Sequence, residues 1–134
     1  MMRAMSETDR IWNRAATQSG GSAPGKGDRH LAAALELHNL AMSGGVPYAV
    51  QRLSDAQLDD AESGLRWLGL PAAAAVVAKV RRKIADGALD DPERAERLQR
   101  RAKRNYAEAV EDDSALLSAF RSRLRTDPDA FAAV

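Results

Sequence analysis

Apolar residues recur at intervals of three and four along most of the chain, which is the spacing of one face of an α-helix. The clearest example follows residue 54, where one apolar face consists of Leu58, Ala61, Leu65 and Leu68. Ser54 and Gln57 precede this face in the S-x-x-Q arrangement of a capping box, which starts a helix. No segment alternates with the period of two that a half-buried strand shows. The pattern therefore predicts an all-α fold.

The segment from Arg29 to Ser43 is apolar on nearly every side. Asp28 can cap its start, and Gly44 and Gly45 supply the backbone freedom that ends a helix. One stripe of this segment consists of Leu31, Leu35, His38 and Met42. A helix that is apolar all round is normally buried in the middle of a bundle. We therefore expect a single-domain bundle of five or six helices around this central buried helix.

Proline residues mark the starts of further helices, because proline is tolerated in the first helical turn. Pro47 opens a short helix that carries Tyr48, and Pro71 opens an alanine-rich helix. Pro92 opens a long charged helix, and a further apolar helix follows residue 114. A last turn is expected to start near residue 128.

Residues 1–28 are predicted to form an N-terminal arm and linker, with the helical domain at residues 29–134. Residues 1–18 can form a short helix that carries Ile11 and Trp12, and Ser6 is a candidate for its cap. The following segment, SGGSAPGKGD, has the glycine, serine and proline content of a flexible linker. It resembles a phosphate-binding loop, but glycine occupies the position of the metal-binding hydroxyl and no strand precedes it. We interpret this segment as a linker.

The composition limits what the protein can do. The chain has 134 residues, of which 45% are hydrophobic and only 4% aromatic. Small side chains bury little area each, at about 25 cal/mol per Å², so we expect modest stability that a homodimer would increase. Charge is balanced, with 20 basic and 19 acidic residues, and cysteine is absent, which excludes disulfides and zinc–thiolate sites. With no signal-like or membrane-spanning run, we expect a cytoplasmic protein.

The polar residues of the central helix are candidates for chemistry. Glu36 and Asn39 share a face, whereas His38 lies on another side. A general base needs an orienting partner and a reacting group within reach, so we expect no enzyme. His30 and His38 are too far apart for the i, i+4 metal pair, and we expect no metal or cofactor. We instead expect Glu36 and Asn39 to fasten the Gly44–Gly45 turn, with a ligand or partner pocket as the alternative.

These residues carry a family resemblance. The matching features are Glu36, Asn39, Gly44, Gly45, Tyr48, the alanine-rich helix after Gly69, Tyr106, Asp112, Asp113, Phe120 and the ending from Asp127 to Phe131. Over roughly residues 31–131 the chain resembles the DNA-mimic-protein-nineteen-like domain family, small bacterial helical domains mostly of unknown function. The resemblance implies a helical fold and a protein-binding role, since the family's named member mimics a DNA duplex and blocks a regulator. A near-neutral chain cannot mimic DNA over its whole surface.

Two surfaces are candidates for binding. The acidic residues Asp55, Asp59, Asp60 and Glu62 lie on one helix, and Trp67 lies beside its apolar face. The basic residues from Arg94 to Arg104 form the other candidate, although glutamates are interleaved and no aromatic platform accompanies them. We expect a non-enzymatic protein–protein interaction module that regulates a partner by occupying its binding surface. The alternative is a nucleic-acid-associated protein that uses the Arg94–Arg104 helix face.

Overall fold

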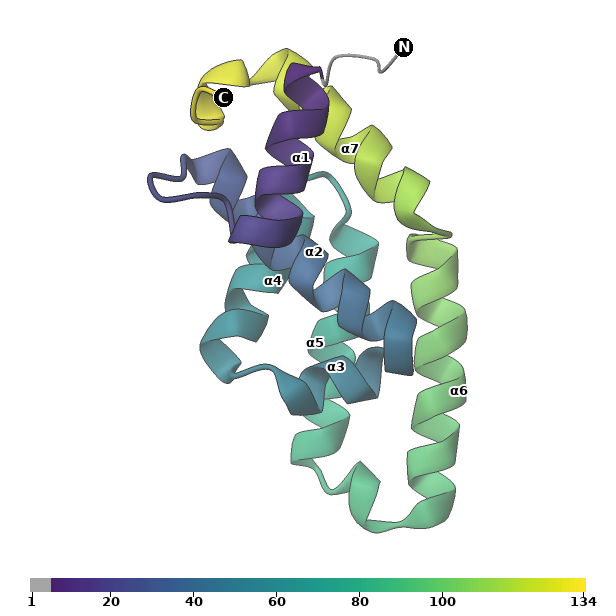
Figure 1. Cartoon of the computed structure of the whole chain (residues 1–134). Helices are drawn as coiled ribbons and strands as arrows, with labels where there is room; N and C mark the ends of the chain where they lie inside the picture. The colour runs from purple at the N-terminus through teal and green to yellow at the C-terminus, as the bar shows by residue number, and fades with distance from the viewer. Residues whose placement is uncertain (1–5) are drawn as a thin grey trace.

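The computed structural model describes residues 6–134, and this part of the chain is helical without any strand. Residues 6–134 form seven α-helices (Figure 1) and two short 3₁₀ helices: α1 (Glu7–Gln18), α2 (Lys26–Gly44), α3 (Val46–Arg52), α4 (Asp55–Trp67), α5 (Pro71–Ala85), η1 (Ala88–Asp90), α6 (Pro92–Ala109), α7 (Asp113–Thr126) and η2 (Pro128–Ala130). The all-α prediction is confirmed, and the helix count exceeds the five or six expected. The first five residues of the predicted N-terminal helix lie outside the described part.

Local capping explains several helix starts. The Ser54 side chain accepts a hydrogen bond from the Gln57 backbone N–H at 3.2 Å, and the Gln57 side chain accepts one from the Ser54 N–H at 2.9 Å. This reciprocal pair confirms the predicted capping box. The start of α2 was predicted wrongly, because the helix begins three residues earlier, at Lys26. Asp28 then lies inside the first turn, where its carboxylate accepts from the Gly25 N–H at 2.9 Å.

The core forms where α2 packs against α1, α3 and α4, and where α5 packs against α4 and α6. The apolar face predicted for α4 is buried at Leu58, Ala61, Leu65 and Leu68. α2 and α4 approach each other closely at Gly64, where an added Cβ would collide with the backbone carbonyl of His30. Leu116 and Phe120 of α7, both fully buried, extend the core towards α1.

The sequence pattern predicted that α2 is apolar and buried on all sides. In the structure, part of its surface is polar and exposed. Its residues Leu31, Leu37 and His38 are at most 1% exposed, but Glu36 and Met42 lie on a face open to solvent. The surrounding helices cover only part of its circumference. The small residues on the remaining face, chiefly alanines, contribute to an open groove instead of a buried contact.

The N-terminal segment is attached to the rest of the molecule. Ile11 is 1% exposed, and the Trp12 ring lies 5.8 Å from the ring of Phe120. Arg14 donates a hydrogen bond to the fully buried carboxylate of Asp28 at 2.8 Å, and that carboxylate also accepts from the Ala132 N–H at 2.7 Å. Residues 6–25 therefore contact both α2 and the C-terminal segment, and their assignment as an arm and linker stays a prediction. A domain boundary at residue 28 stays a prediction.

Candidate binding groove

A groove of about 550 Å³ runs between α5 and α6. The two helices are consecutive, are joined through η1 and run antiparallel (Figure 1). The apolar part of the lining consists of Ala72, Ala75, Val76, Val80, Ala88, Leu98, Ala102 and Ala109. We refer to this surface as the α5–α6 groove.

The α5–α6 groove exists because small side chains face each other across the two helices. α5 directs Ala73, Ala74 and Val77 into the core, which leaves Ala72 and Ala75 on its exposed side. α6 meets the core along a stripe of Leu98, Ala102 and Tyr106. Alanine carries only a Cβ, so the helices leave a hollow beside their contact that larger side chains would fill.

The rim of the α5–α6 groove is strongly basic. Its positively charged residues are Lys79, Lys83, Arg94, Arg97 and Arg101, whereas Glu108 is the one carboxylate in the lining. Within residues 6–134, no acidic side chain forms a recorded ion pair with any of these five cations. The groove thus combines an apolar floor with positive charge that is available to a ligand.

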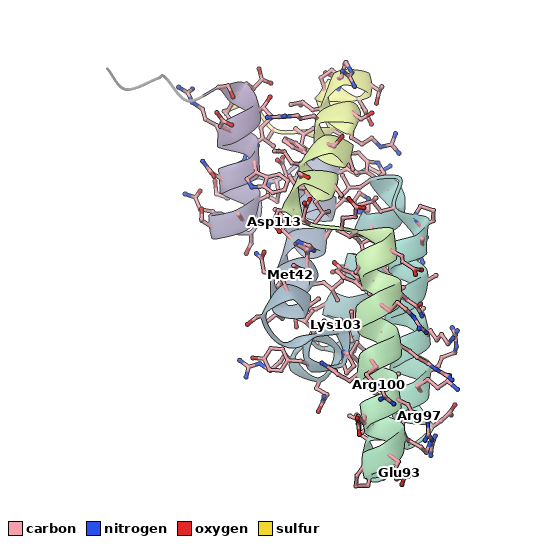
Figure 2. The ribbon with its side chains drawn as sticks, turned by 90° about the vertical axis from the view of Figure 1, so that its right-hand side faces the viewer. Met42, Glu93, Arg97, Arg100, Lys103 and Asp113 are labelled. Carbon is pink, nitrogen blue, oxygen red and sulfur yellow. The ribbon has the colours of Figure 1, made fainter. Side chains whose placement is uncertain are left out.

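The basic surface continues onto the outer side of α6. Figure 2 shows Arg97, Arg100 and Lys103 along this side, below Met42 and Asp113. Arg100 forms only a long, exposed pair with Glu96, at 3.6 Å, which contributes little to stability. Arg97, Arg100, Arg101 and Arg104 also line a smaller hollow of about 310 Å³. The basic face predicted from Arg94 to Arg104 therefore borders the α5–α6 groove.

The acidic residues predicted for partner binding are largely paired within the protein. Arg81 of α5 contacts Asp55 at 3.5 Å, Asp59 at 2.8 Å and the partly buried Glu62 more closely still. Hydrogen bonds to Asp59 and Glu62 raise the pKa of Arg81 well above its usual value, so the guanidinium stays charged. Arg81 contacts three of the four carboxylates and offsets one of their charges, and Asp60 lies apart from them beside a second groove. A partner-binding role for this face stays a prediction.

Trp67, the aromatic residue predicted to contact a partner, is half-buried against the bundle. Its ring stacks on His30 with centroids 5.1 Å apart and meets the edge of Phe131 at 5.8 Å. The guanidinium of Arg123 lies 4.6 Å from the ring centroid, and its Nε donates to the Trp67 carbonyl at 2.8 Å. Trp67 thus joins α2, α4, α7 and the C-terminal segment.

The predicted structural motif divides into two parts. Gly44, Gly45 and Tyr48 meet at the turn after α2, where the Tyr48 ring lies against the space that a Gly44 side chain would fill. Gly45 has φ +94°, and Gln99 of α6 donates to the Gly44 carbonyl at 3.3 Å. The side chain that contacts this turn therefore comes from α6. A local sequence pattern does not predict such a contact between distant helices.

Glu36 and Asn39 line another surface of α2, and their role in fastening the turn stays a prediction. Both are exposed and line the second groove, of about 930 Å³, formed by α1, α2 and α4. Glu36 accepts a hydrogen bond from Gln57 of α4 at 3.4 Å. Basic and acidic residues alternate around this groove, so it carries no dominant charge: Lys26, Arg29, Glu36 and Asp60. The groove corresponds to the pocket that we named as the alternative for these two residues.

His38 is a second buried polar residue of α2, besides Asp28, and the sequence pattern suggested no partner for it. Its Nδ1 lies 2.8 Å from the Tyr106 hydroxyl, and its Nε2 lies 2.7 Å from Asp113. Burial, together with the charge of Asp113, raises the pKa of Tyr106, so the phenol keeps its proton. The three residues link α2 to α6 and to the start of α7. A helical His38 stripe was visible in the sequence, but the partners 68 and 75 residues away were not.

The comparison with protein families gives one finding that covers most of the molecule. The model described as DMP19-like protein matches residues 25–133. The chain belongs to the DMP19-like family. This confirms the resemblance drawn from the sequence, and the match includes α5, α6 and the groove between them. No curated protein and no solved structure matches the chain.

The DMP19-like match begins at Gly25, so α1 precedes the part that defines the family. Arg14 nevertheless connects α1 to Asp28 and to the Ala132 carbonyl, both inside the matched part. None of the helices within residues 6–134 is both long enough and apolar enough to span a bilayer.

Proposed function

We propose that this DMP19-like protein is a non-enzymatic protein-interaction module that regulates a partner by occupying part of its surface. The observation that carries the proposal is the α5–α6 groove, whose apolar floor is open to solvent beside five cations that form no ion pair within residues 6–134. Burial of such a floor by a partner is favourable by about 25 cal/mol per Å² of apolar area. Interface hot spots are typically side chains that fill pockets of this kind within a polar rim.

The family supports a protein partner, because the DNA mimic for which the family is named acts on another protein. The charge distribution of this chain, however, favours a partner whose surface differs from the basic DNA-binding surface that a DNA mimic occupies. Arg81 offsets one of the negative charges on the acidic face of α4, whereas the α5–α6 groove is positively charged. A positively charged groove attracts an acidic partner and repels a basic DNA-binding surface.

Site-specific photocrosslinking tests which surface the partner contacts. A photoreactive amino acid replaces Ala75, an exposed residue of the groove floor, or Asp59, on the acidic face of α4. In extract of the source cells, the proposal predicts a discrete protein adduct at position 75 that mass spectrometry identifies. The adduct should disappear in Arg97→Glu/Arg101→Glu, which reverses two charges on the rim. An adduct at position 59 and none at position 75 would reject the groove and support the acidic face.

A nucleic-acid-associated function is the second candidate, and the cluster of Arg97, Arg100, Arg101 and Arg104 favours it. Binding through phosphates should weaken steeply as salt rises, because each neutralised phosphate releases a counterion. Arg100→Ala/Arg104→Ala would lower the affinity and the salt dependence, whereas Ala75→Trp would change neither. Absence of binding to duplex and single-stranded DNA and RNA at low salt would remove this candidate.

A further inference from the structure

We infer that the α5–α6 groove receives an amphipathic α-helix of a partner protein, with carboxylates towards the C-terminal end of that helix. The inference rests on the proposed function and specifies the partner's chemistry and direction.

The dimensions of the groove fit a helix. The lining runs from Ala72 to Lys83 on α5 and from Arg94 to Ala109 on α6. At 1.5 Å per residue these stretches are roughly 17 Å and 22 Å long, which corresponds to about 12–15 residues of a bound helix. A trough between two antiparallel helices is also the shape into which a third helix packs with ridges in grooves.

The floor of the groove specifies the apolar face of the bound helix. Alanine and valine dominate the floor, so bulky side chains such as leucine, phenylalanine or methionine would fill the hollow between α5 and α6. Such residues, spaced at i, i+3, i+4 and i+7, are the anchors of helix-in-groove recognition. The lining contains no aromatic side chain on which a nucleic-acid base could stack. The floor therefore favours a peptide helix over a single-stranded nucleic acid.

The charges along the rim give the bound helix a direction. Lys83 and Arg94 lie at the end where η1 joins the two helices, and Arg97 lies one turn further along α6. Glu108 lies at the opposite end, beside Ala72 and Ala109. The acidic residues of the connection, Asp86, Asp90 and Asp91, do not line the groove. A helix places its negative dipole end at its C-terminus, so that end should lie near Lys83 and Arg94.

Two labelled 15-residue peptides test this inference by fluorescence anisotropy. Both carry the same leucine stripe and the same hydrocarbon staple, so that their helicity is equal. One has lysine near its N-terminus and three glutamates near its C-terminus, and the other has these charged residues exchanged. The structure predicts that the first peptide binds the wild-type protein about tenfold more tightly than the second. Its affinity should fall as salt rises, because the rim is exposed.

Variants of the full chain separate the contributions. Ala75→Trp fills the floor and should abolish binding of both peptides, while Ala56→Trp on the exposed side of α4 is the matched control and should not. Lys83→Glu/Arg94→Glu should reverse the preference between the two peptides. Circular dichroism checks that each variant is folded, and a variant that loses helicity is replaced by Ala72→Trp for the floor or by Arg97→Glu for the rim.

The outcomes distinguish this inference from the proposed function. If neither peptide binds but a partner still crosslinks at position 75, the groove binds protein without a helix of this polarity, and the inference is wrong. If both peptides bind equally, the predicted direction is wrong. A dimer in size-exclusion chromatography with light scattering that Ala75→Trp dissociates would show that a second copy occupies the groove, which also overturns the inference.

Discussion

Arg81 of α5 donates a short hydrogen bond to the carboxylate of Glu62 on α4, whose side chain is only 10% exposed. The same Nη1 atom donates to Asp59 at 2.8 Å. The contact crosses between two helices that also form part of the core. The acidic face of α4 is therefore a part of the structure that holds α5 in place, and through α5 it positions one wall of the α5–α6 groove.

Arg81→Met should destabilise the fold by about 2 kcal/mol, because it removes the main partner of a carboxylate that has lost much of its solvent. The long contact between Arg66 and Glu62, at 3.7 Å, replaces only part of the interaction. Urea denaturation measures the change. Arg82→Met, at an exposed position one residue later on the same helix, is the control and should change stability by less than about 0.5 kcal/mol. Equal effects of the two variants would contradict a role for the Arg81–Glu62 pair.

Asp28→Asn should destabilise the protein by about 3 kcal/mol, since Asp28 is fully buried and pairs with Arg14. An asparagine amide would also point a donor at one of the three groups that now donate to this carboxylate, namely Arg14, Gly25 N–H and Ala132 N–H. Urea denaturation and hydrogen exchange check the effect. Exchange should accelerate in α1 and at the C-terminus together, because Asp28 connects the two.

Asp129→Asn is the matched control for this substitution, because Asp129 is an exposed carboxylate of the same C-terminal region. It should leave both stability and exchange nearly unchanged. Acceleration confined to α1 after Asp28→Asn would contradict a shared anchor.

These contacts show where sequence reasoning succeeds and where it ends. The capping box of Ser54 and Gln57 lies within three residues, so backbone chemistry alone predicts it. The burial of Leu58 and Leu65 is also predictable from nearby residues, because the helical period places both side chains on one face. The contact of Asp28 with Ala132 spans 104 residues, and nothing in the glycine-rich segment beside Asp28 indicates it. Composition indicates a linker there, and it carries no signal for the contacts that Asp28 makes with the C-terminal segment.

The candidate groove illustrates the same limit. The basic residues from Arg94 to Arg104 were identified from sequence as a charged face, since charge runs are visible locally. The hollow beside them depends on Ala75 of α5 lying across from Ala102 of α6. Alanine in a helix carries no signal that distinguishes a groove wall from a close-packed contact. Likewise, Arg81 and Lys83 belong to one basic run in the sequence, yet Arg81 pairs with α4 while Lys83 lines the groove.

Tyr106→Phe should cost about 1 kcal/mol, the usual contribution of a hydrogen bond, because it removes the hydroxyl 2.8 Å from His38 Nδ1. The substitution should also change how the free energy of unfolding depends on pH in the alkaline range. Burial raises the pKa of Tyr106 above its ordinary value of 10.0, so the unfolded chain releases this proton first. Stability that depends on the neutral phenol is complete below pH 10.0 and declines above it.

The alkaline decline of the wild type should therefore be steeper than that of Tyr106→Phe in denaturant titrations from about pH 8 to pH 11. Tyr48→Phe is the control, because Tyr48 is half-buried and lies outside the His38 contacts. If Tyr106→Phe and the wild type lose stability in parallel, the phenol of Tyr106 has the same pKa in the folded and the unfolded chain, which would contradict the prediction.

His30→Gln should change how stability depends on acid. Burial in the first place, and then the nearby Lys26, lower the pKa of His30 below 6.5, and Asp60 opposes that shift only partly. Below pH 6.5 the unfolded chain takes up this proton more readily than the folded protein, so the wild type loses stability as the pH falls towards the lowered folded-state pKa.

At about pH 7.5 we expect His30→Gln to be the less stable protein, because it loses the stacking of His30 on Trp67. The difference from the wild type should then narrow as the pH falls from about 6.5 to 5, since glutamine does not titrate. Thermal denaturation across this range measures the difference. A difference that stays constant over this range would mean that His30 takes up its proton equally in the folded and unfolded chain, contrary to its partly buried position beside Lys26 and Trp67.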